Sequence, residues 1–310
     1  MRVLVTGGAG FIGSHLARRL VEDGHDVVVI DNMRTGQRAA VPRAARIVEL
    51  DLDRSNFLDQ VPPPRFDAVC HLAAQSSGPA SAEVPYYDLQ ANAGSTVLLS
   101  RWCLEQGTPR FIYASSMAVY GSPDELPVRE TAPCVPLSYY GVSKLTSEHV
   151  LRLAAAEGLS VTSFRMFSVY GPGQNLGNLR QGMASIYLAY LLQGVPVPVT
   201  GSLKRFRDFV YIDDVIDAWL RALYRPSTPA LEYNIGAGER TEVGDLISRL
   251  AVALGREPDY PVQELAGHIG DQFGLCADIS RAEQDLGWRP VTPLDEGLRR
   301  MVEWAQGLEP

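Results

Sequence analysis

Short apolar runs alternate with longer, mixed stretches over the first two thirds of the chain. The apolar runs fall at residues 2–6, 26–30, 46–50, 67–72, 109–115 and 160–166, and stretches of helix length lie at 11–23, 85–106 and 140–157. Most of the runs are continuously apolar, which is typical of parallel strands covered by helices on both faces. The pattern therefore predicts an α/β fold, a doubly wound parallel sheet built from right-handed βαβ crossovers.

The regular alternation weakens after about residue 168. Gly and Pro cluster at 171–177 and 194–201, and a helical stretch lies between them near 179–193. Strand and helix patterns follow at 209–224 and 231–235, and helical patterns near 243–254 and 293–306. We predict a first domain over residues 1–167, with return segments near 209–236, and a smaller α/β C-terminal domain over 168–310.

Composition and charge exclude several classes of function. The chain carries 28 Lys and Arg against 36 Asp and Glu, so its net charge of −8 gives no overall electrostatic reason to bind nucleic acid. No apolar run approaches the ~18 residues of a membrane helix, and no signal-peptide pattern precedes the first strand. The cysteines and histidines show no metal-binding spacing. We expect a cytoplasmic protein with no membrane partner and no metal.

A glycine-rich loop joins the first predicted strand to the first predicted helix. Gly7, Gly10 and Gly13 permit a tight turn whose backbone amides can approach a pyrophosphate at the helix N-terminus. Asp31 ends the second strand about 20 residues later, where a dinucleotide site places a carboxylate on the adenosine ribose. An acid there repels a 2′-phosphate, so NAD is favoured over NADP. Asp51 and Leu52 follow the third strand and suit the adenine, although a solvated loop remains the alternative for Asp51.

A tyrosine and a lysine lie one helical turn apart in the stretch 140–157. Tyr140 and Lys144 share a helix face at positions i and i+4. A lysine cation beside a phenol favours the phenolate, so Tyr140 becomes a usable proton acceptor. Ser115 and Ser116 follow the fifth strand at the carboxyl edge of the sheet, where ligands bind. A serine hydroxyl in this place can donate a hydrogen bond to a substrate oxygen.

Taken together, these segments resemble the extended short-chain dehydrogenase/reductase family, and within it the NAD-dependent nucleotide-sugar epimerases and dehydratases. The similarity covers nearly the whole chain and is closest to UDP-glucose 4-epimerase and its relatives. The matching segments are TGGAGFIGSHL at 6–16, DN at 31–32, DL at 51–52, HLAAQ at 71–75, Asn92, SSMAVYG at 115–121, YGVSK at 140–144, FRMFSVYGPGQN at 164–175, RDFVYIDDV at 207–215, NIGAG at 234–238 and AD at 277–278.

The resemblance implies a Rossmann domain that binds NAD and a C-terminal domain that binds the nucleotide sugar. It assigns catalysis to Ser116, Tyr140 and Lys144. The cofactor-binding residues it implies are Gly7, Gly10, Phe11, Ile12, Gly13, Asp31, Asn32, Asp51, Leu52, Leu72, Ala73, Ala74, Gln75, Asn92, Ser115, Tyr140, Lys144 and Phe167. The substrate-binding residues it implies are Ser116, Ser168, Met183, Arg207, His268 and Asp271.

The residues before Val119 discriminate among members of the family. Met117 and Ala118 stand where the 4,6-dehydratases carry an Asp-Glu pair and where decarboxylating members carry a Glu in the last position. Neither side chain exchanges a proton, which argues against a dehydratase and, more weakly, against a decarboxylase. The resemblance then implies a 4-epimerase of a UDP-sugar that works through a transient 4-keto sugar. A UDP-glucuronate 4-epimerase or decarboxylase, or another dehydratase or reductase on this fold, remains the alternative.

Some positions on the substrate side depart from the family pattern. His268 replaces the arginine of the usual R-x-G-D tetrad that ends at Asp271, and Ser168 replaces the usual asparagine. Leu275 stands where some epimerases carry a tyrosine that excludes N-acetylated sugars, so we expect UDP-N-acetylhexosamines to fit. The resemblance also implies a homodimer formed through the helices near 90–106 and 140–157.

Overall fold

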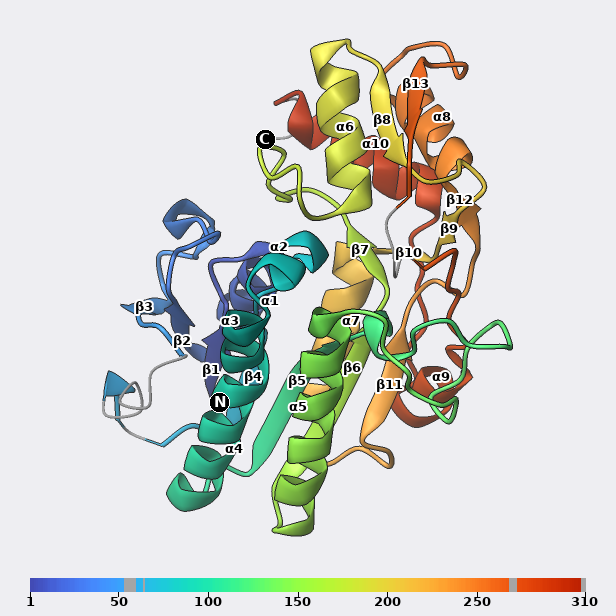
Figure 1. The fold of residues 1–310 in the computed structure, drawn as a ribbon. Coiled ribbons are helices and arrows are strands. Elements are labelled where there is room, and N and C mark those ends of the chain that lie inside the picture. The colour runs from blue at the N-terminus through green and yellow to red at the C-terminus, as the bar shows by residue number, and fades with distance from the viewer. Residues whose placement is uncertain (53–59, 64, 268–271, 308–310) are drawn as a thin grey trace.

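A seven-stranded parallel sheet forms the centre of the structure, in the strand order β11-β6-β5-β4-β1-β2-β3 (Figure 1). This computed structural model describes residues 1–52, 60–63, 65–267 and 272–307. The strands of the sheet are β1 (Arg2–Thr6), β2 (Asp26–Asp31), β3 (Arg46–Glu49), β4 (Ala68–His71), β5 (Arg110–Ser116), β6 (Ser160–Met166) and β11 (Glu232–Ile235). The doubly wound parallel sheet predicted from the apolar runs is therefore confirmed.

Both faces of the sheet are buried, which explains why its strands are continuously apolar. On β1, Val3 and Val5 belong to one hydrophobic core, whereas Leu4 between them belongs to another. The first core contains side chains of α1 (Phe11–Glu22) and α7 (Ile212–Leu223), and the second contains side chains of α4 (Ser95–Gln106) and α5 (Tyr139–Ala156). Since successive strand residues point to opposite faces, helices on both sides favour apolar residues at consecutive positions.

The winding of the chain fixes where a ligand can bind. From β1 the chain passes to β2 and β3 at one edge, and then returns to place β4 on the other side of β1. In such a sheet the ligand crevice lies outside the carboxyl ends of the strands, at the point where the winding direction reverses. The loops after β1 and β4 therefore face this crevice, and both contain predicted site residues.

The later part of the chain adds three small strand pairs and their helices. β7 (Ser168–Tyr170) pairs with β10 (Phe209–Tyr211), β9 (Phe206–Arg207) with β12 (Thr241–Glu242), and β8 (Val197–Thr200) with β13 (Val262–Leu265). The helices are α6 (Met183–Gln193), α8 (Val243–Ala253), α9 (Ser280–Leu286) and α10 (Leu294–Ala305). β11 pairs with β6 in the large sheet, and α7 packs against β5. The division into domains at residue 167 stays a prediction.

Two predicted helices differ from the structure. The stretch 85–106 is divided into α3 (Pro85–Leu89), a π-helical turn (Gln90–Gly94) and α4, and the short α2 (Gly78–Glu83) precedes it. The helix expected near 179–193 begins only at Met183, because Gly182 has a left-handed backbone with φ of 85°. Among the residues that the structure describes, no helix combines the length and apolar character needed to cross a membrane.

Candidate active site

The glycine-rich loop packs closely against itself and against the segment after β4. Gly7 has φ of +70°, and a Cβ on it would lie 2.6 Å from the backbone nitrogen of Ala73. A Cβ on Gly13 would lie 2.2 Å from the carbonyl oxygen of Gly7. Gly10 begins α1 without a side-chain cap, so the helix presents its first amides at this loop. These features fit the pyrophosphate of a dinucleotide.

Asp31, Asn32 and Asp51 lie beside this loop. The buried Asp31 carboxylate accepts hydrogen bonds from the backbone nitrogens of Ala9 (3.0 Å) and Met33 (2.9 Å), so it ties the glycine loop to the end of β2. Asn32 donates from Nδ2 to Oδ1 of Asp51 at 3.0 Å, which joins the ends of the second and third strands. The structure thus brings together the acidic residues that were predicted at the adenosine end of the cofactor.

The segment after β4 is held in place by hydrogen bonds on both sides. The backbone nitrogen of Ala73 donates to Oγ1 of Thr6 at 3.2 Å, and that of Gln75 donates to Oδ1 of Asn92 at 2.8 Å. Asn92 in turn donates to the Gln75 carbonyl at 3.0 Å. Residues 72–75 therefore pass between the glycine loop and the π-helical turn that carries Asn92.

Ser116, Tyr140 and Lys144 meet at the carboxyl end of β5. Ser138 caps α5 by accepting a hydrogen bond from the Gly141 nitrogen at 3.1 Å, which places Tyr140 in the first helical turn. The Ser116 hydroxyl lies close enough to the Tyr140 hydroxyl to lower the pKa of the phenol. Nζ of Lys144 lies 5.7 Å from the centre of the Tyr140 ring and donates to the Ala114 carbonyl at 2.8 Å. The structure therefore brings the three predicted catalytic residues together.

Burial opposes the charged forms of Tyr140 and Lys144. It lowers the pKa of Lys144 to about 7, while the nearby Asp88 and Glu148 carboxylates act to raise it. It also raises the pKa of Tyr140 to about 12, although the nearby Ser116 hydroxyl acts in the opposite direction. The chain by itself thus keeps Tyr140 protonated at neutral pH, and ionisation of the phenol needs further positive charge close to the ring.

Two buried carboxylates beside Lys144 were missed in the sequence. Asp88 on α3 accepts hydrogen bonds from Oγ of Ser143 (2.6 Å) and Nε2 of Gln75 (3.1 Å). Glu148 on α5 forms a bidentate ion pair with Arg165 of β6 at 2.7 and 2.9 Å, in which both side chains are almost completely buried. Glu148 follows Lys144 by one helical turn, and that spacing is the signal that could have revealed it.

Ser115 differs in its surroundings from Ser116. Its side chain is buried, and its hydroxyl donates to Oε1 of Glu148 at 2.6 Å. The cofactor role predicted for Ser115 stays a prediction.

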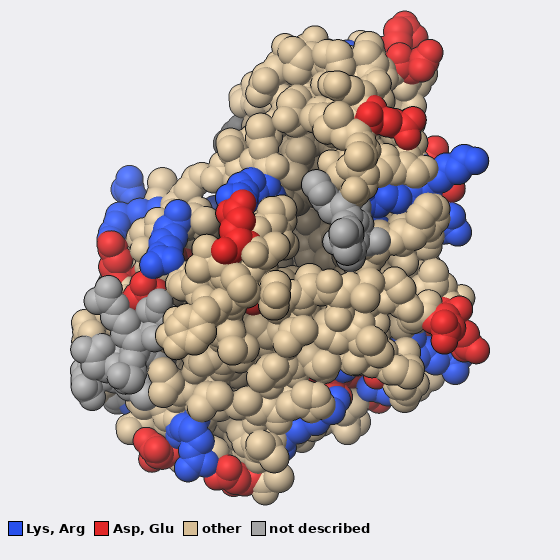
Figure 2. All heavy atoms as spheres, in the orientation of Figure 1, with Lys and Arg blue, Asp and Glu red and all other residues tan. Residues whose placement is uncertain are grey.

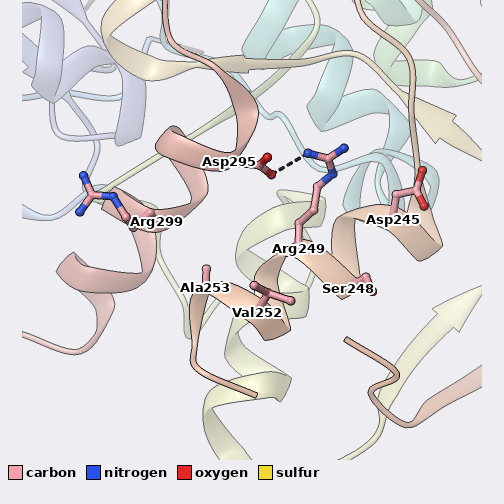
Figure 3. Close-up of a pocket in the computed structure, with 7 residues that line it drawn as sticks. All are labelled: Asp245, Ser248, Arg249, Val252, Ala253, Asp295 and Arg299. Atoms are coloured by element: carbon pink, nitrogen blue, oxygen red, sulfur yellow. Dashed lines mark hydrogen bonds and ion pairs between the residues drawn. The ribbon is translucent and has the colours of Figure 1, made fainter. Parts of the chain in front are cut away.

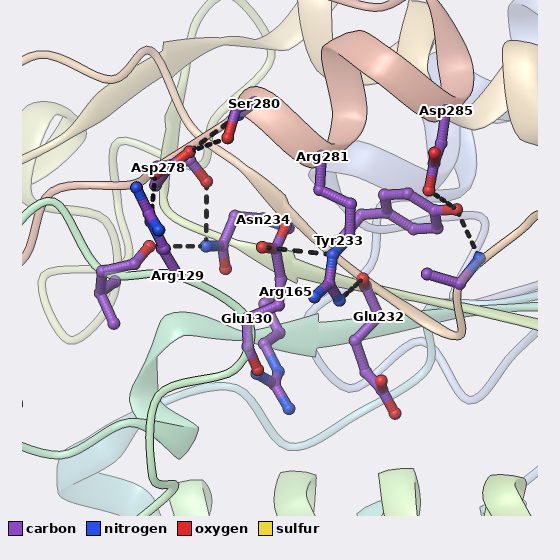
Figure 4. A network of polar contacts seen from close by, with 12 residues as sticks. Arg129, Glu130, Arg165, Glu232, Tyr233, Asn234, Asp278, Ser280, Arg281 and Asp285 are labelled. Carbon is purple, nitrogen blue, oxygen red and sulfur yellow. Dashed lines mark hydrogen bonds and ion pairs between the residues drawn. The ribbon is translucent and has the colours of Figure 1, made fainter.

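The ion pair of Glu148 continues into a larger polar network, part of which Figure 4 shows. Arg165 donates to the Glu130 carbonyl at 3.0 Å, and the Glu130 carboxylate accepts from the Asn234 nitrogen at 2.8 Å. Asn234 donates to the carbonyls of Val128 (2.9 Å) and Asp278 (3.2 Å). The network therefore joins β6 and β11 to the loop between β5 and α5, and this loop leads directly to Tyr140.

Phe167 of the predicted cofactor set and Ser168, Met183 and Arg207 of the predicted substrate set come from the chain after β6. Phe167 and Ser168 follow β6, and their backbone nitrogens donate to the carbonyls of Ile235 and Asp208, both at 2.9 Å. The buried Arg207 donates to the carbonyls of Gln272 (3.1 Å) and Phe273 (3.3 Å). Met183 is the half-buried first residue of α6. His268 and Asp271 lie outside the described residues.

The prediction for Leu275 is not supported. Its side chain is completely buried in a hydrophobic cluster with Val119, Tyr120, Val128, Phe167 and Ala277. Leu275 therefore does not face open space, and its small size gives no direct reason for N-acetylated sugars to fit.

A surface pocket between α8 and α10 lies apart from these residues (Figure 3). It is lined by Asp245, Ser248, Arg249, Val252, Ala253, Asp295 and Arg299, and an ion pair of 2.6 Å joins Arg249 to Asp295 across it. None of these seven residues belongs to the predicted site. The candidate site is instead the crevice at the strand ends, and Figure 2 shows the surface hollowed beneath the part of the molecule that contains α6.

A doubly wound sheet with a glycine loop, an acid at the end of β2 and a Ser-Tyr-Lys set is the arrangement of a dinucleotide-dependent enzyme. The model of the NAD dependent epimerase/dehydratase family matches residues 3–236. The chain belongs to this family.

Individual relatives are similar over nearly the full length. A putative UDP-glucose 4-epimerase of Methanocaldococcus jannaschii is 34% identical over 304 residues, which cover 97% of each chain. The crystal structure of UDP-glucose 4-epimerase from Thermotoga maritima with UDP-glucose has a TM-score of 0.94 at 33% identity and covers 100% of both chains. The UDP-glucose 4-epimerase of Thermus thermophilus, in complex with NAD, has a TM-score of 0.90 at 33% identity and covers 99% of both.

The glycine loop allows a direct test of cofactor retention. In Gly13→Ala the new Cβ would lie 2.2 Å from a backbone oxygen, so the loop must shift. We expect NAD released from the denatured protein to fall below about a tenth of the wild-type amount, a loss of more than ~1.4 kcal/mol of binding free energy. The control is Gly78→Ala, whose Cβ meets nothing within 4 Å. Full NAD content in Gly13→Ala would contradict the assignment of this loop.

The buried ion pair makes a prediction about stability. Glu148→Gln leaves the Arg165 cation buried without its partner, so the free energy of unfolding should fall by about 3–5 kcal/mol. Glu157→Gln is the matched control, because the Arg101–Glu157 pair is half exposed and should contribute at most ~1 kcal/mol. Urea denaturation measures the free energy of unfolding of both variants. Equal losses of free energy would show that burial of the Glu148–Arg165 pair adds nothing to its effect on stability.

Proposed function

We propose that this chain is an NAD-dependent 4-epimerase of a UDP-sugar, either UDP-glucose and UDP-galactose or their N-acetylhexosamine counterparts. The observation that carries the proposal is the meeting of Ser116, Tyr140 and Lys144 beside the glycine loop at the carboxyl edge of the sheet. The similarity to UDP-glucose 4-epimerases supports a UDP-sugar as the substrate.

The residues of the first domain would hold the cofactor. The amides of the glycine loop would bind the pyrophosphate, Asp31 the adenosine ribose, and Asn32, Asp51 and Leu52 the adenine, while Lys144 would also bind the nicotinamide ribose. Bound NAD⁺ supplies a reversible hydride acceptor for C4 of the sugar and a positive charge near the tyrosine ring. That charge is what the buried Tyr140 phenol needs to ionise near neutral pH.

The protein residues act on the proton and the oxygen atom of the C4 hydroxyl group. Tyr140 accepts the proton of the C4 hydroxyl while the C4 carbon is oxidised, and returns it to the same oxygen when C4 is reduced from its other face. Ser116 donates a hydrogen bond to that oxygen. The Lys144 cation favours the tyrosine phenolate. The proton and the hydrogen at C4 both return to the sugar, so the cycle consumes no cofactor.

The turn that follows Ser116 favours epimerisation over elimination. Met117 and Ala118 belong to a 3₁₀ turn (Met117–Val119) whose Ala118 nitrogen donates to Oγ of Ser116 at 3.2 Å. Neither side chain has a proton to exchange, so the loss of water across C5 and C6 lacks an acid and a base here. The UDP-glucuronate 4-epimerase alternative uses the same three catalytic residues and is separated from our proposal only by the sugar.

The substrate residues are proposals of the same kind. Arg207 is suited to the diphosphate, because a planar guanidinium can donate two parallel hydrogen bonds to phosphate oxygens. We assign Ser168, Met183, His268 and Asp271 to the remaining contacts with the UDP-sugar. A cytoplasmic location remains an expectation from the sequence.

The test of function measures turnover of UDP-sugars and compares two tyrosine variants. Anomeric proton NMR of UDP-glucose, UDP-N-acetylglucosamine, UDP-glucuronate and UDP-xylose, with no added NAD, should show conversion at C4. Tyr140→Phe should lower the rate at least about a hundredfold with NAD still bound, because the variant loses its proton acceptor. Tyr139→Phe, one residue earlier and exposed, should keep the wild-type rate. Release of CO₂ or water, or full activity in Tyr140→Phe, would contradict the proposal.

We further infer a homodimer formed through α4 and α5. The two helices pack side by side on one face of the sheet, and Val97 of α4 and Val142 and Leu153 of α5 are 40–69% exposed. In Figure 2 the middle of this face carries few charged side chains. An exposed apolar face of this kind suits a second copy of the chain.

Light scattering measures the mass of this assembly. The wild type should have about twice the chain mass of 33.9 kDa. The double variant Val97→Glu/Val142→Glu should be monomeric, because it places charge in the proposed contact. Val252→Glu on α8, also at an exposed valine, should stay dimeric. A wild-type monomer, or an unaffected double variant, would contradict the inference.

A further inference from the structure

Asp208, next to Arg207 in the chain, is a completely buried carboxylate with an unusual set of partners. It accepts hydrogen bonds from the backbone nitrogens of Ala237 (2.5 Å), Gly238 (3.0 Å) and Ala277 (3.0 Å). A buried carboxylate must be compensated by such donors, since its desolvation is costly. Asp208 therefore depends on backbone groups that are 29 to 69 positions away in the sequence.

These three donors come from two separate segments that reach the carboxyl edge of the sheet. Ala237 and Gly238 follow β11, and Ala277 lies in the segment 272–278 after the undescribed residues. Close approach is possible because residue 236 is glycine: a Cβ there would lie 2.6 Å from Oδ2 of Asp208. The Asp208 carbonyl also accepts a hydrogen bond from the Ser168 nitrogen. Asp208 thus joins three parts of the chain around Arg207.

Arg207 holds the same late segment at a second place. Its guanidinium donates to the carbonyls of Gln272 and Phe273, while Asp208 accepts from Ala277 four positions later. Arg207 and Asp208, which are adjacent in the chain, thus fix the two ends of the segment 272–277. The segment cannot move away without breaking contacts to both, and Arg207 cannot turn without disturbing the strand end that Asp208 anchors.

We propose that Asp208 is a positioning residue for the UDP-sugar, which acts by holding Arg207 and residues 272–277 in place around the diphosphate. This inference rests on the proposed function and on the assignment of Arg207 to the diphosphate. Asp208 lies behind Arg207 and does not touch the reacting carbon. Its loss should therefore weaken substrate binding and leave the chemical step almost unchanged.

The carboxylate also makes binding depend on pH. Burial raises the pKa of Asp208 to about 6, and the charge of Glu239 adds to this rise. The hydrogen bonds from the three amides act in the opposite direction and lower the pKa. Among the described residues, the Cys276 thiol also lies near this carboxylate, and burial raises the pKa of that thiol to about 12. The ionised carboxylate accepts hydrogen bonds from the three amides more strongly than the protonated acid does, so affinity should fall as the pH drops through about 6. The diphosphate diester of a UDP-sugar has no group that titrates there.

The experiment compares Asp208→Asn with Asp214→Asn. Asp214 is also buried and accepts one backbone hydrogen bond, from Thr292 at 3.0 Å, so its loss controls for general damage to the fold. UDP-glucose binding is measured by calorimetry in the Tyr140→Phe background from pH 5 to 8, and KM and kcat are measured without that background. Asp208→Asn should raise both the dissociation constant and KM about tenfold or more at pH 7.5, and should keep kcat within about twofold. It should also abolish the pH step, which is the fall in affinity near pH 6. Asp214→Asn should keep the affinity and the step.

Gly236→Ala provides a second variant, because its Cβ would push against Oδ2 of Asp208 and should raise KM in the same way. Wild-type affinity and an unchanged pH step in both Asp208→Asn and Gly236→Ala would overturn the inference, and so would equal effects of Asp208→Asn and Asp214→Asn. A wild-type protein that retains NAD but does not bind UDP-glucose would instead overturn the proposed substrate.

Discussion

The structure of the site depends on keeping one lysine charged inside a sheet–helix interface. Lys144 is almost completely buried, and burial lowers its pKa to about 7, close to the pH at which its charge is needed. Two carboxylates oppose this loss of charge, Asp88 from α3 and Glu148 from α5. Each is held by its own donors, which are Ser143 and Gln75 for Asp88, and Arg165 and Ser115 for Glu148. Much of the buried polar structure behind β5 thus stabilises the charge on a single ammonium group.

The fold places the groups that act with Lys144 at the same edge. Parallel winding brings the ends of β1, β4 and β5 together, so that the glycine loop, residues 72–75 and Ser116 lie at one edge of the sheet. The N-cap of α5 then sets Tyr140 beside Ser116. On the other side of the crevice, Arg207 and Asp208 fix the segment 272–277. In the proposed function, the cofactor and the sugar would bind on opposite sides of this edge.

The sequence alone predicted what is encoded locally. Continuous apolar runs predicted the parallel sheet, and the i, i+4 spacing predicted that Tyr140 and Lys144 share a helix face. Asp88 and Asp208 escaped prediction because their donors lie far away in the sequence, on segments whose approach only the folded chain defines. Strands of two residues such as β9 and β12 carry too little pattern to detect, and the burial of Leu275 depends on a cluster assembled from four separate segments.

The most direct measurement follows the hydrogen atom at C4. Purified protein with no added NAD is given UDP-galactose that carries deuterium at C4, and the UDP-glucose formed is examined by NMR and mass spectrometry. If the same C4 hydrogen leaves and returns within one closed site, the product keeps the deuterium at C4, and no hydrogen from the solvent replaces it. Loss of deuterium to water, or conversion only after NAD is added and consumed, would contradict the account of Ser116, Tyr140 and Lys144 given above.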